Sequence, residues 1–261
     1  MSKITKASID QFVKTGFLKL EQVFSQELAE NALEILWKAT GKNSNDTSTW
    51  TEPVIYLGDF AQRVFREAAN SPLLHQTFDA LVGVDNWIPR MSLGSFPVRF
   101  PSSKTTADTG WHVDASFPGD DPADYRKWRI NICSKNRSLL MLFLFTDVSE
   151  KDAPTRLKVG SHMEIARILH PYGQKGLDFM ELAEKIDTSS MICTEALATG
   201  KAGTVYLCHP FLVHSAQAHR GKTPKFMAQP PLFTKNDLSP LMEKESYPPV
   251  EIAIRKALKL M

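Results

Sequence analysis

The spacing of apolar residues along the chain changes at about residue 89. Before that point, apolar positions recur every three or four residues, which is the spacing of one helix face. The clearest case is the segment from Ser25 to about Lys38, where Ser25 supplies an N-terminal cap. Its apolar stripe comprises Leu28, Ala32, Ile35 and Leu36. The first third, residues 1–88, is therefore predicted to be a helical layer.

Other elements of this layer follow from turn residues and local periodicity. Asp10 is a candidate cap for a short first helix, and residues 17–20 after Gly16 are expected to form a strand. Two further helices are predicted at about 60–69 and 72–81. Residues 41–51 are rich in Asn, Ser and Thr without periodicity, which predicts a loop.

After residue 89 the chain consists of short β-rich runs separated by Gly, Pro, Asn and Asp, a pattern typical of a sandwich or barrel. The predicted strands are 90–96, 110–115, 128–133, 139–148, 155–159, 203–209 and 225–233. A helical insertion is expected at 165–186, and residues 236–261 are expected to end the chain with a helix. No linker divides the sequence, so the prediction is one mainly β domain with flanking helices over residues 1–261, its β core spanning 89–235.

Composition agrees with a globular protein and excludes several classes. Hydrophobic residues make up 43% and charged residues 23% of the 261, enough for one large core. The net charge is only +2 and the basic residues are scattered, which argues against nucleic acid as a partner. The longest apolar run, 139–145, is too short to cross a membrane, and the polar N-terminal segment does not resemble a secretory signal. Three cysteines without CxxC spacing indicate reduced thiols and a cytoplasmic location.

Candidate chemistry begins with His112 and Asp114. Residues two apart in a strand point to the same face, so both side chains would face one site. Neutral imidazole and carboxylate together suit a first-row metal such as Fe(II). Such a pair arises often by chance, and two exposed polar groups on a surface strand would give the same pattern.

A third ligand is expected from residues 199–215, where a turn leads into an apolar strand that ends in histidines. Two histidines and one carboxylate would form the facial triad that leaves iron positions open for O₂ and a bidentate co-substrate. His209, His214 and His219 compete for this role. His209 reads as a packed core residue and His219 as part of a turn, whereas small residues after His214 leave room for a ligand.

The order of these motifs resembles that of the phytanoyl-CoA dioxygenase family, within the Fe(II)/2-oxoglutarate oxygenases. The motifs are His112-Val-Asp114, Val159-Gly-Ser-His162 and His209-Pro-Phe-Leu-Val-His214, after an N-terminal Phe12-Val-Lys-Thr-Gly-Phe17. The resemblance implies a double-stranded β-helix (jelly-roll, cupin-like) core and iron held by His112, Asp114 and His214. It also implies 2-oxoglutarate and O₂ as co-substrates, with succinate and CO₂ released while a small molecule is oxidised.

The expected 2-oxoglutarate anchor departs from the family pattern. Lys225 stands eleven residues after His214, where the family usually has an arginine. A lysine offers a point charge in place of a bidentate fork, so the exchange is not conservative. Arg220 is the rival anchor, and Ser215 lies one place before the serine that the family often uses beside the co-substrate. The retained Asp114 favours hydroxylation over halogenation, because related halogenases lack this carboxylate.

Five further residues are candidates for the substrate pocket. They are Trp111, Arg129, Arg156, Met227 and Gln229, and for each of them core packing or a solvated surface is the alternative. Two alternative functions also remain. One is a non-catalytic metal- or ligand-binding β-barrel of the same fold, and the other is a zinc or nickel enzyme that needs no 2-oxoglutarate.

Overall fold

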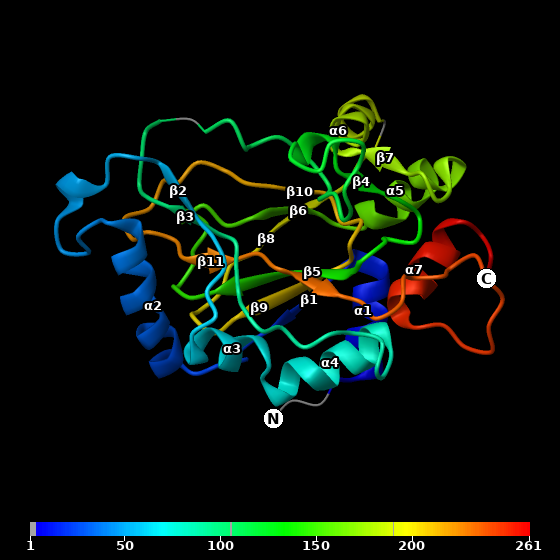
Figure 1. The fold of residues 1–261 in the computed structure, drawn as a ribbon, viewed down its shortest axis with the longest axis horizontal. Coiled ribbons are helices and arrows are strands. Elements are labelled where there is room, and N and C mark those ends of the chain that lie inside the picture. The colour runs from blue at the N-terminus through cyan, green and yellow to red at the C-terminus, as the bar shows by residue number, and fades with distance from the viewer. Residues whose placement is uncertain (1–3, 105, 190) are drawn as a thin grey trace.

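The computed structural model describes residues 4–104, 106–189 and 191–261, which form a mainly β protein with helices around it (Figure 1). The helices are α1 (Lys6–Thr15), α2 (Gln26–Thr40), α3 (Arg63–Ala69), α4 (Pro72–Val82), α5 (Ser161–Leu169), α6 (Phe179–Thr188) and α7 (Pro249–Ala257). Short 3₁₀ turns lie at η1 (Thr47–Thr49), η2 (Tyr125–Lys127) and η3 (His170–Tyr172). Within the described residues, no helix has the length and apolar character needed to cross a bilayer.

In the described residues, twelve strands build one larger and one smaller sheet and two strand pairs. The larger sheet has the order β1 (Phe17–Leu20), β9 (Val205–Cys208), β5 (Arg137–Leu144), β11 (Met227–Ala228), and β12 (Pro231–Phe233) also pairs with β5. The smaller sheet has the order β10 (His214–Ser215), β6 (Arg156–Lys158), β8 (Glu195–Leu197). The pairs are β2 (Val54–Leu57) with β3 (Phe96–Arg99) and β4 (Arg129–Ile130) with β7 (Leu177–Asp178).

Strand β5 is buried along its whole length and divides the core into two parts. Because alternate side chains of a strand point to opposite faces, Leu139, Met141 and Phe143 join the larger cluster, with the helices. Leu140, Leu142 and Leu144 join a smaller cluster with residues of β6, β9 and β11. The smaller cluster therefore lies between the two sheets.

Single β-bridges join the two candidate ligand segments and extend the larger sheet. His112 forms an antiparallel bridge with His214, which places the 112 segment beside β10. Arg99 forms a second bridge with Lys225, with N–O distances of 3.0 and 2.8 Å in the two directions. Segments about 100 residues apart in the sequence are thus fixed side by side by backbone hydrogen bonds.

Helices α1, α3, α4 and α7 cover the face of the larger sheet that points away from the smaller sheet. Side chains Phe12 of α1, Phe65 of α3, Phe78 of α4 and Ala253 of α7 belong to the larger core cluster. In Figure 1, α3 and α4 run beneath β9 and β1, whereas α5 and α6 lie above the opposite end of the fold. This leaves the far face of the smaller core free of the N-terminal layer.

Several predicted elements are confirmed, among them β1, the Ser25 cap of α2 and the helix α4. Asp10 is not a cap: Thr5 caps α1 by accepting from the backbone N–H of Ser8, and Asp10 pairs with Lys6 on the exposed face. The predicted insertion 165–186 is instead two helices, α5 and α6, with a turn and β7 between them.

Two predicted strands are wrong and several short strands were missed. The strand expected at 90–96 begins only at Phe96, because Arg90 folds back and donates to the carbonyl of Ser92. Residues 110–115 form no strand beyond the bridge at His112. Strands β2, β7 and β8 were missed, because β2 is a continuous apolar run of four residues without alternation and the other two have only two and three residues.

Candidate metal centre and its two cavities

Three side chains converge between the sheets. His112 and His214 are brought together by their backbone bridge, and their ring centroids lie 4.4 Å apart. Asp114 Oδ1 lies 3.7 Å from the Nε2 atom of each histidine. One ligand atom from each residue falls within 4.8 Å of the others, close to the spacing of donors that share one metal ion.

Backbone hydrogen bonds fix how both imidazoles face this centre. Nδ1 of His112 lies 2.9 Å from the carbonyl oxygen of Gly110, and Nδ1 of His214 lies 3.0 Å from that of Leu212. A carbonyl only accepts, so each Nδ1 carries the proton and each Nε2 keeps its lone pair for the centre. Burial lowers the pKa of His214 to about 4, which keeps this imidazole neutral.

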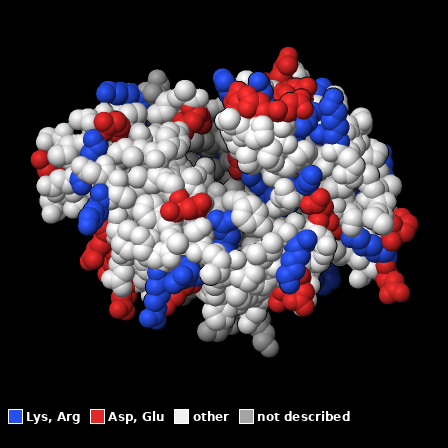
Figure 2. All heavy atoms as spheres, viewed as in Figure 1, with Lys and Arg blue, Asp and Glu red and all other residues white. Residues whose placement is uncertain are grey.

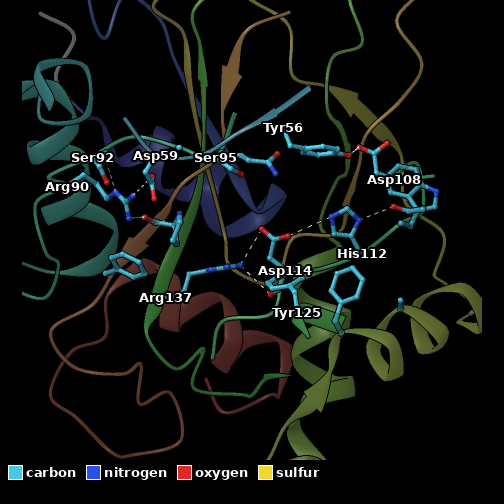
Figure 3. Close-up of a pocket in the computed structure, with 18 of the residues that line it drawn as sticks. Tyr56, Asp59, Arg90, Ser92, Ser95, Asp108, His112, Asp114, Tyr125 and Arg137 are labelled. Carbon is cyan, nitrogen blue, oxygen red and sulfur yellow. Dashed lines mark hydrogen bonds and ion pairs between the residues drawn. The ribbon is translucent and has the colours of Figure 1, made fainter. Parts of the chain in front are cut away.

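The two oxygens of Asp114 have different partners. Oδ1 faces the histidines, while Oδ2 lies 3.4 Å from Nη1 of Arg137 (Figure 3). Arg137 also donates to the carbonyl oxygen of Ala115 at 2.8 Å. Burial opposes ionisation of Asp114, but His214 and the Arg137 guanidinium hold its pKa below the ordinary value. The carboxylate is therefore charged and oriented at neutral pH.

A large cavity of about 990 Å³ opens on one side of the centre. His112 and Asp114 lie in its wall, together with Arg137 and Tyr125. Figure 2 shows the corresponding face hollowed near its middle, bordered mainly by residues other than Lys, Arg, Asp and Glu. This space is called the outer cavity below.

A second cavity, of about 130 Å³, lies on the other side and is called the inner cavity. His112 and His214 line it, and so do two cationic residues, Arg99 and Lys225. Lys225 is 1% exposed, and its Nζ donates to the carbonyl oxygen of Ala153 at 2.5 Å. Burial, together with the nearby Arg99 charge, lowers the pKa of Lys225 to about 7. Arg99 pairs with Asp108, which also accepts from Tyr56 Oη.

Three of the five predicted pocket residues line these cavities. Trp111 is in the wall of the outer cavity, Met227 in that of the inner cavity, and Gln229 in both. Arg129 and Arg156 lie outside both. Arg129 donates to the carbonyls of Lys175 and Gly176, whereas Arg156 pairs with Glu195 and covers the Trp111 ring at 4.4 Å. These arginines hold the walls and do not face the cavities.

The remaining candidates are separated by burial and contacts. The Ser215 hydroxyl lies 2.7 Å from the carbonyl oxygen of Thr109 and lines neither cavity. Arg220 is exposed, and only its backbone N–H is held, by Lys151. His209 is buried against α7, where its Nε2 lies 3.0 Å from the Val250 carbonyl oxygen. His219 lies 2.8 Å from the carbonyl oxygen of Thr223. Neither of these histidines belongs to the cluster of possible ligands.

Arg99 and Arg137 are site residues that the sequence did not single out. Arg99 lies 126 positions before Lys225 and is recognisable only through its pairing with that lysine. Arg137 begins a strand whose other residues are apolar up to Leu144, apart from Ser138. A charged residue at the start of an otherwise apolar strand was the signal that the sequence offered.

Several solved structures share this fold. The alpha ketoglutarate dependent carbocyclase SnoK from nogalamycin biosynthesis is 17% identical, covering 88% of this chain and 84% of its own, with a TM-score of 0.59. The epimerase SnoN in complex with Fe³⁺, alpha ketoglutarate and nogalamycin RO is 15% identical, covering 88% and 82%, with a TM-score of 0.57. HygX from Streptomyces hygroscopicus with nickel and 2-oxoglutarate bound is 17% identical, covering 87% and 86%, with a TM-score of 0.54. At these identities the likeness defines the fold, which is that of non-haem 2-oxoglutarate-dependent enzymes.

The family follows from the sequence itself. The model of the phytanoyl-CoA dioxygenase family matches residues 12–227, most of the 261-residue chain. The chain therefore belongs to the phytanoyl-CoA dioxygenase family. No functionally curated protein is significantly similar to it in sequence.

Proposed function

We propose that this protein is an Fe(II)- and 2-oxoglutarate-dependent dioxygenase that hydroxylates or otherwise oxidises a small molecule. The observation that carries the proposal is the convergence of His112, Asp114 and His214 with both Nδ1 atoms already committed to carbonyls. Two neutral imidazoles and one carboxylate are the donor set that non-haem Fe(II) oxygenases use. When bound there, iron supplies the redox chemistry by which O₂ converts 2-oxoglutarate to succinate and CO₂ and oxidises the substrate.

Arg137 has a positioning role in this proposal. Its guanidinium holds Asp114 Oδ2, so that Oδ1 alone turns toward the two histidines. The charge of Arg137 also keeps the carboxylate ionised, which a metal ligand must be. The centre thus keeps one oxygen for the metal and leaves other positions to co-substrate and O₂.

The inner cavity is the proposed 2-oxoglutarate site. It adjoins both histidines and is lined by Lys225 and by Arg99, which pairs with Asp108 of the same lining. A dicarboxylate entering there would place its keto-acid end at the centre and its distal carboxylate by Lys225. A bound anion favours the charged form of the lysine, which burial alone disfavours. Arg220, exposed on a turn, and Ser215, outside the cavity, receive less support.

The outer cavity is the proposed substrate site, with Trp111 and Gln229 in its wall. Gln229 and His112 line both cavities, so a molecule bound in the outer cavity would adjoin the co-substrate across the metal. The walls contributed by α6 and η2 would contact a substrate bound there and help to orient it. HygX and SnoN have been crystallised with the small molecules hygromycin B and nogalamycin RO, which supports a small-molecule substrate here.

Three broader points belong to the same proposal. The two sheets facing each other across the smaller core support a double-stranded β-helix, and one continuous larger core supports a single oxygenase domain. The scattered positive charge supports a protein that acts on small molecules and not on nucleic acid. Three unpaired cysteines support a cytoplasmic location.

Anaerobic metal analysis combined with a succinate assay tests the proposal. The expected result is one Fe(II) per chain and succinate formed from 2-oxoglutarate, with inhibition by N-oxalylglycine. Stoichiometric iron without any succinate across a broad screen of small molecules would favour a non-catalytic binding protein. Activity with zinc or nickel and without 2-oxoglutarate would favour the other alternative.

A further inference from the structure

Exposed apolar side chains gather at the outer cavity. Within the described residues, 13 large apolar side chains are exposed, and six of these line this one cavity. The six are Tyr56, Ile88, Met91, Tyr125, Met180 and Phe233. They come from β2, the segment before β3, η2, α6 and β12, so five separate parts of the chain contribute. Such a gathering of exposed apolar surface marks a binding site more often than chance.

The charges around this cavity are unsuited to an anionic ligand. Among its described lining residues, four are aspartates and two are arginines. Both arginines are already engaged: Arg137 with Asp114 and the Ala115 carbonyl, Arg90 with the Ser92 carbonyl and, at 3.6 Å, with Asp59. Each arginine is less than 9% exposed, whereas Asp59 and Asp187 present exposed carboxylates. The accessible charge at the mouth is therefore negative.

We propose that the outer cavity binds a neutral, largely apolar small molecule of drug size, and not a CoA thioester. This inference rests on the proposed function and names the substrate class of the same site. A volume of about 990 Å³ fits a molecule of that size, since pockets for drug-sized ligands span ~300–1,000 Å³. The CoA moiety of an acyl-CoA carries phosphates, which need cationic or backbone donors that the accessible wall does not offer.

Helix α6 is the main selector in this proposal. Met180, Ala183 and Asp187 recur at helical spacing and turn one face of α6 into the cavity, while Phe179 at its start contacts His112 with ring centroids 5.5 Å apart. Met180 supplies apolar contact area and Asp187 supplies negative charge. A change at either position should alter what the cavity accepts without touching the metal ligands.

Binding of Nile red tests whether the outer cavity takes a largely apolar ligand. This dye is neutral and ring-bearing, and its fluorescence rises in apolar surroundings. The full-length protein is loaded anaerobically with Fe(II) and 2-oxoglutarate, and dye affinity is measured for the wild type, Met180→Arg and Met242→Arg. Met242 is exposed outside the cavity and is the matched control. We expect Met180→Arg to weaken dye binding about 3–10-fold, because it replaces apolar contact area with a charged group, and Met242→Arg to leave dye binding unchanged.

Displacement of the dye by decan-1-ol and by decanoyl-CoA tests the proposed preference for a neutral ligand. The two compounds have alkyl chains of the same length and differ in the charged CoA group. The wild type should release the dye at a decanol concentration at least ~10-fold below that of decanoyl-CoA. Asp187→Lys should narrow this gap by about three- to five-fold, and Glu184→Lys, exposed on α6 outside the cavity lining, should not.

Several outcomes overturn the inference. They are no dye binding by the wild type, equal dye affinity in Met180→Arg and Met242→Arg, and decanoyl-CoA competing as well as decanol. Fe(II) binding and succinate formation are measured on the same samples. If Fe(II) binds and succinate forms but the dye measurements give one of the overturning outcomes, the proposed substrate class is wrong and the proposed function stands. If the dye results hold without Fe(II) or 2-oxoglutarate binding, only the proposed function is wrong.

Discussion

The two cavities on either side of the candidate metal centre differ in size, charge and construction. The inner one, about 130 Å³, adjoins a lysine and an arginine that are both buried. The outer one, about 990 Å³, has exposed apolar walls and no accessible cation among its described lining residues. A small space with a buried lysine in its wall suits one fixed dicarboxylate, whereas a large apolar space suits a bulkier and less polar molecule.

The two cavities are also built from different kinds of chain segment. Arg99 and Lys225 stand opposite each other in a β-bridge, where two backbone hydrogen bonds fix their separation. The outer walls come mostly from segments outside the larger sheet, such as residues 88–91, η2 and α6. Paired strands tolerate little change in register, while such segments vary freely. The architecture thus keeps the chemistry constant and leaves specificity adjustable.

The centre that both cavities share should give the largest effect. His214→Ala should abolish stoichiometric Fe(II) binding, since changes to second-sphere residues alone already cost about 10–100-fold in affinity. His209→Ala is the matched control, because it removes a buried imidazole that contacts α7 and not the centre. Anaerobic equilibrium dialysis measures both. Normal iron binding by His214→Ala with loss in His209→Ala would mean that the ligand is misassigned.

Removing the charge of Lys225 should weaken the binding of 2-oxoglutarate and leave the binding of Fe(II) unchanged. In Lys225→Ala the distal carboxylate of 2-oxoglutarate would lose a charge-assisted partner, worth ~1.5–3 kcal/mol or about 10–100-fold in the dissociation constant. Arg220→Ala, at an exposed position, should leave that constant unchanged. Calorimetric titration of 2-oxoglutarate into the anaerobic Fe(II) form of each variant shows whether Lys225 or Arg220 is the anchor. The reverse pattern would move the anchor to Arg220.

Arg137 offers a test of the outer side of the centre. Arg137→Met removes the partner of Asp114 Oδ2 and frees the carboxylate to turn, so Fe(II) affinity should fall about 10-fold. Arg137→Lys should lose less Fe(II) affinity than Arg137→Met, because the lysine still places a positive charge near the Asp114 carboxylate. Fe(II) titrations of the three proteins, with circular dichroism to verify folding, measure this. Unchanged affinity in Arg137→Met would show that Asp114 is held by other contacts.

The pKa of Lys225 predicts how co-substrate binding depends on pH. Burial first, then the Arg99 charge, lowers this pKa to about 7, and Asp108 opposes the shift only in part. Nearby His219 stays neutral in this range, because burial lowers its pKa as well. Above pH 7 the free lysine is neutral and must take up a proton to pair with a carboxylate. The 2-oxoglutarate dissociation constant should therefore rise by up to ~10-fold per pH unit above 7, whereas Lys225→Met should bind weakly without this slope.

The last effect is on the stability of the metal-free protein and not on binding. Lys225 has an ordinary pKa of 10.5 and a native pKa of about 7, so the unfolded chain binds more protons between these values. The free energy of unfolding of the wild type should then rise with pH across this window, and the buried charge is most costly below pH 7. Lys225→Met should raise that free energy by ~1–3 kcal/mol at pH 6 and by less at pH 9. Urea denaturation at both pH values measures the difference, and a loss of stability in the variant would contradict it.

Local sequence patterns determined much of the framework. A Ser cap with helical periodicity predicts α2, and a run of apolar residues predicts the buried strand β5. The pair His112 and Asp114, with His214 a hundred residues later, indicates the candidate metal centre once motif order is added, and the structure brings these three residues together. These signals succeed because capping, periodicity and ligand type depend on residues close together in the chain or on the chemistry of single side chains.

What the sequence could not determine depends on which distant strands become neighbours. Arg99 was missed because only its pairing with Lys225 brings it to the inner cavity. Arg137 was missed because its partner Asp114 lies 23 positions away, in a segment that forms no regular strand. Arg129 and Arg156 were expected in the pocket, but backbone carbonyls and Glu195 hold them outside it. A periodic pattern shows which face of an element is polar; only the packed structure decides whether that face meets a cavity, another chain segment or solvent, because long-range contacts set its surroundings.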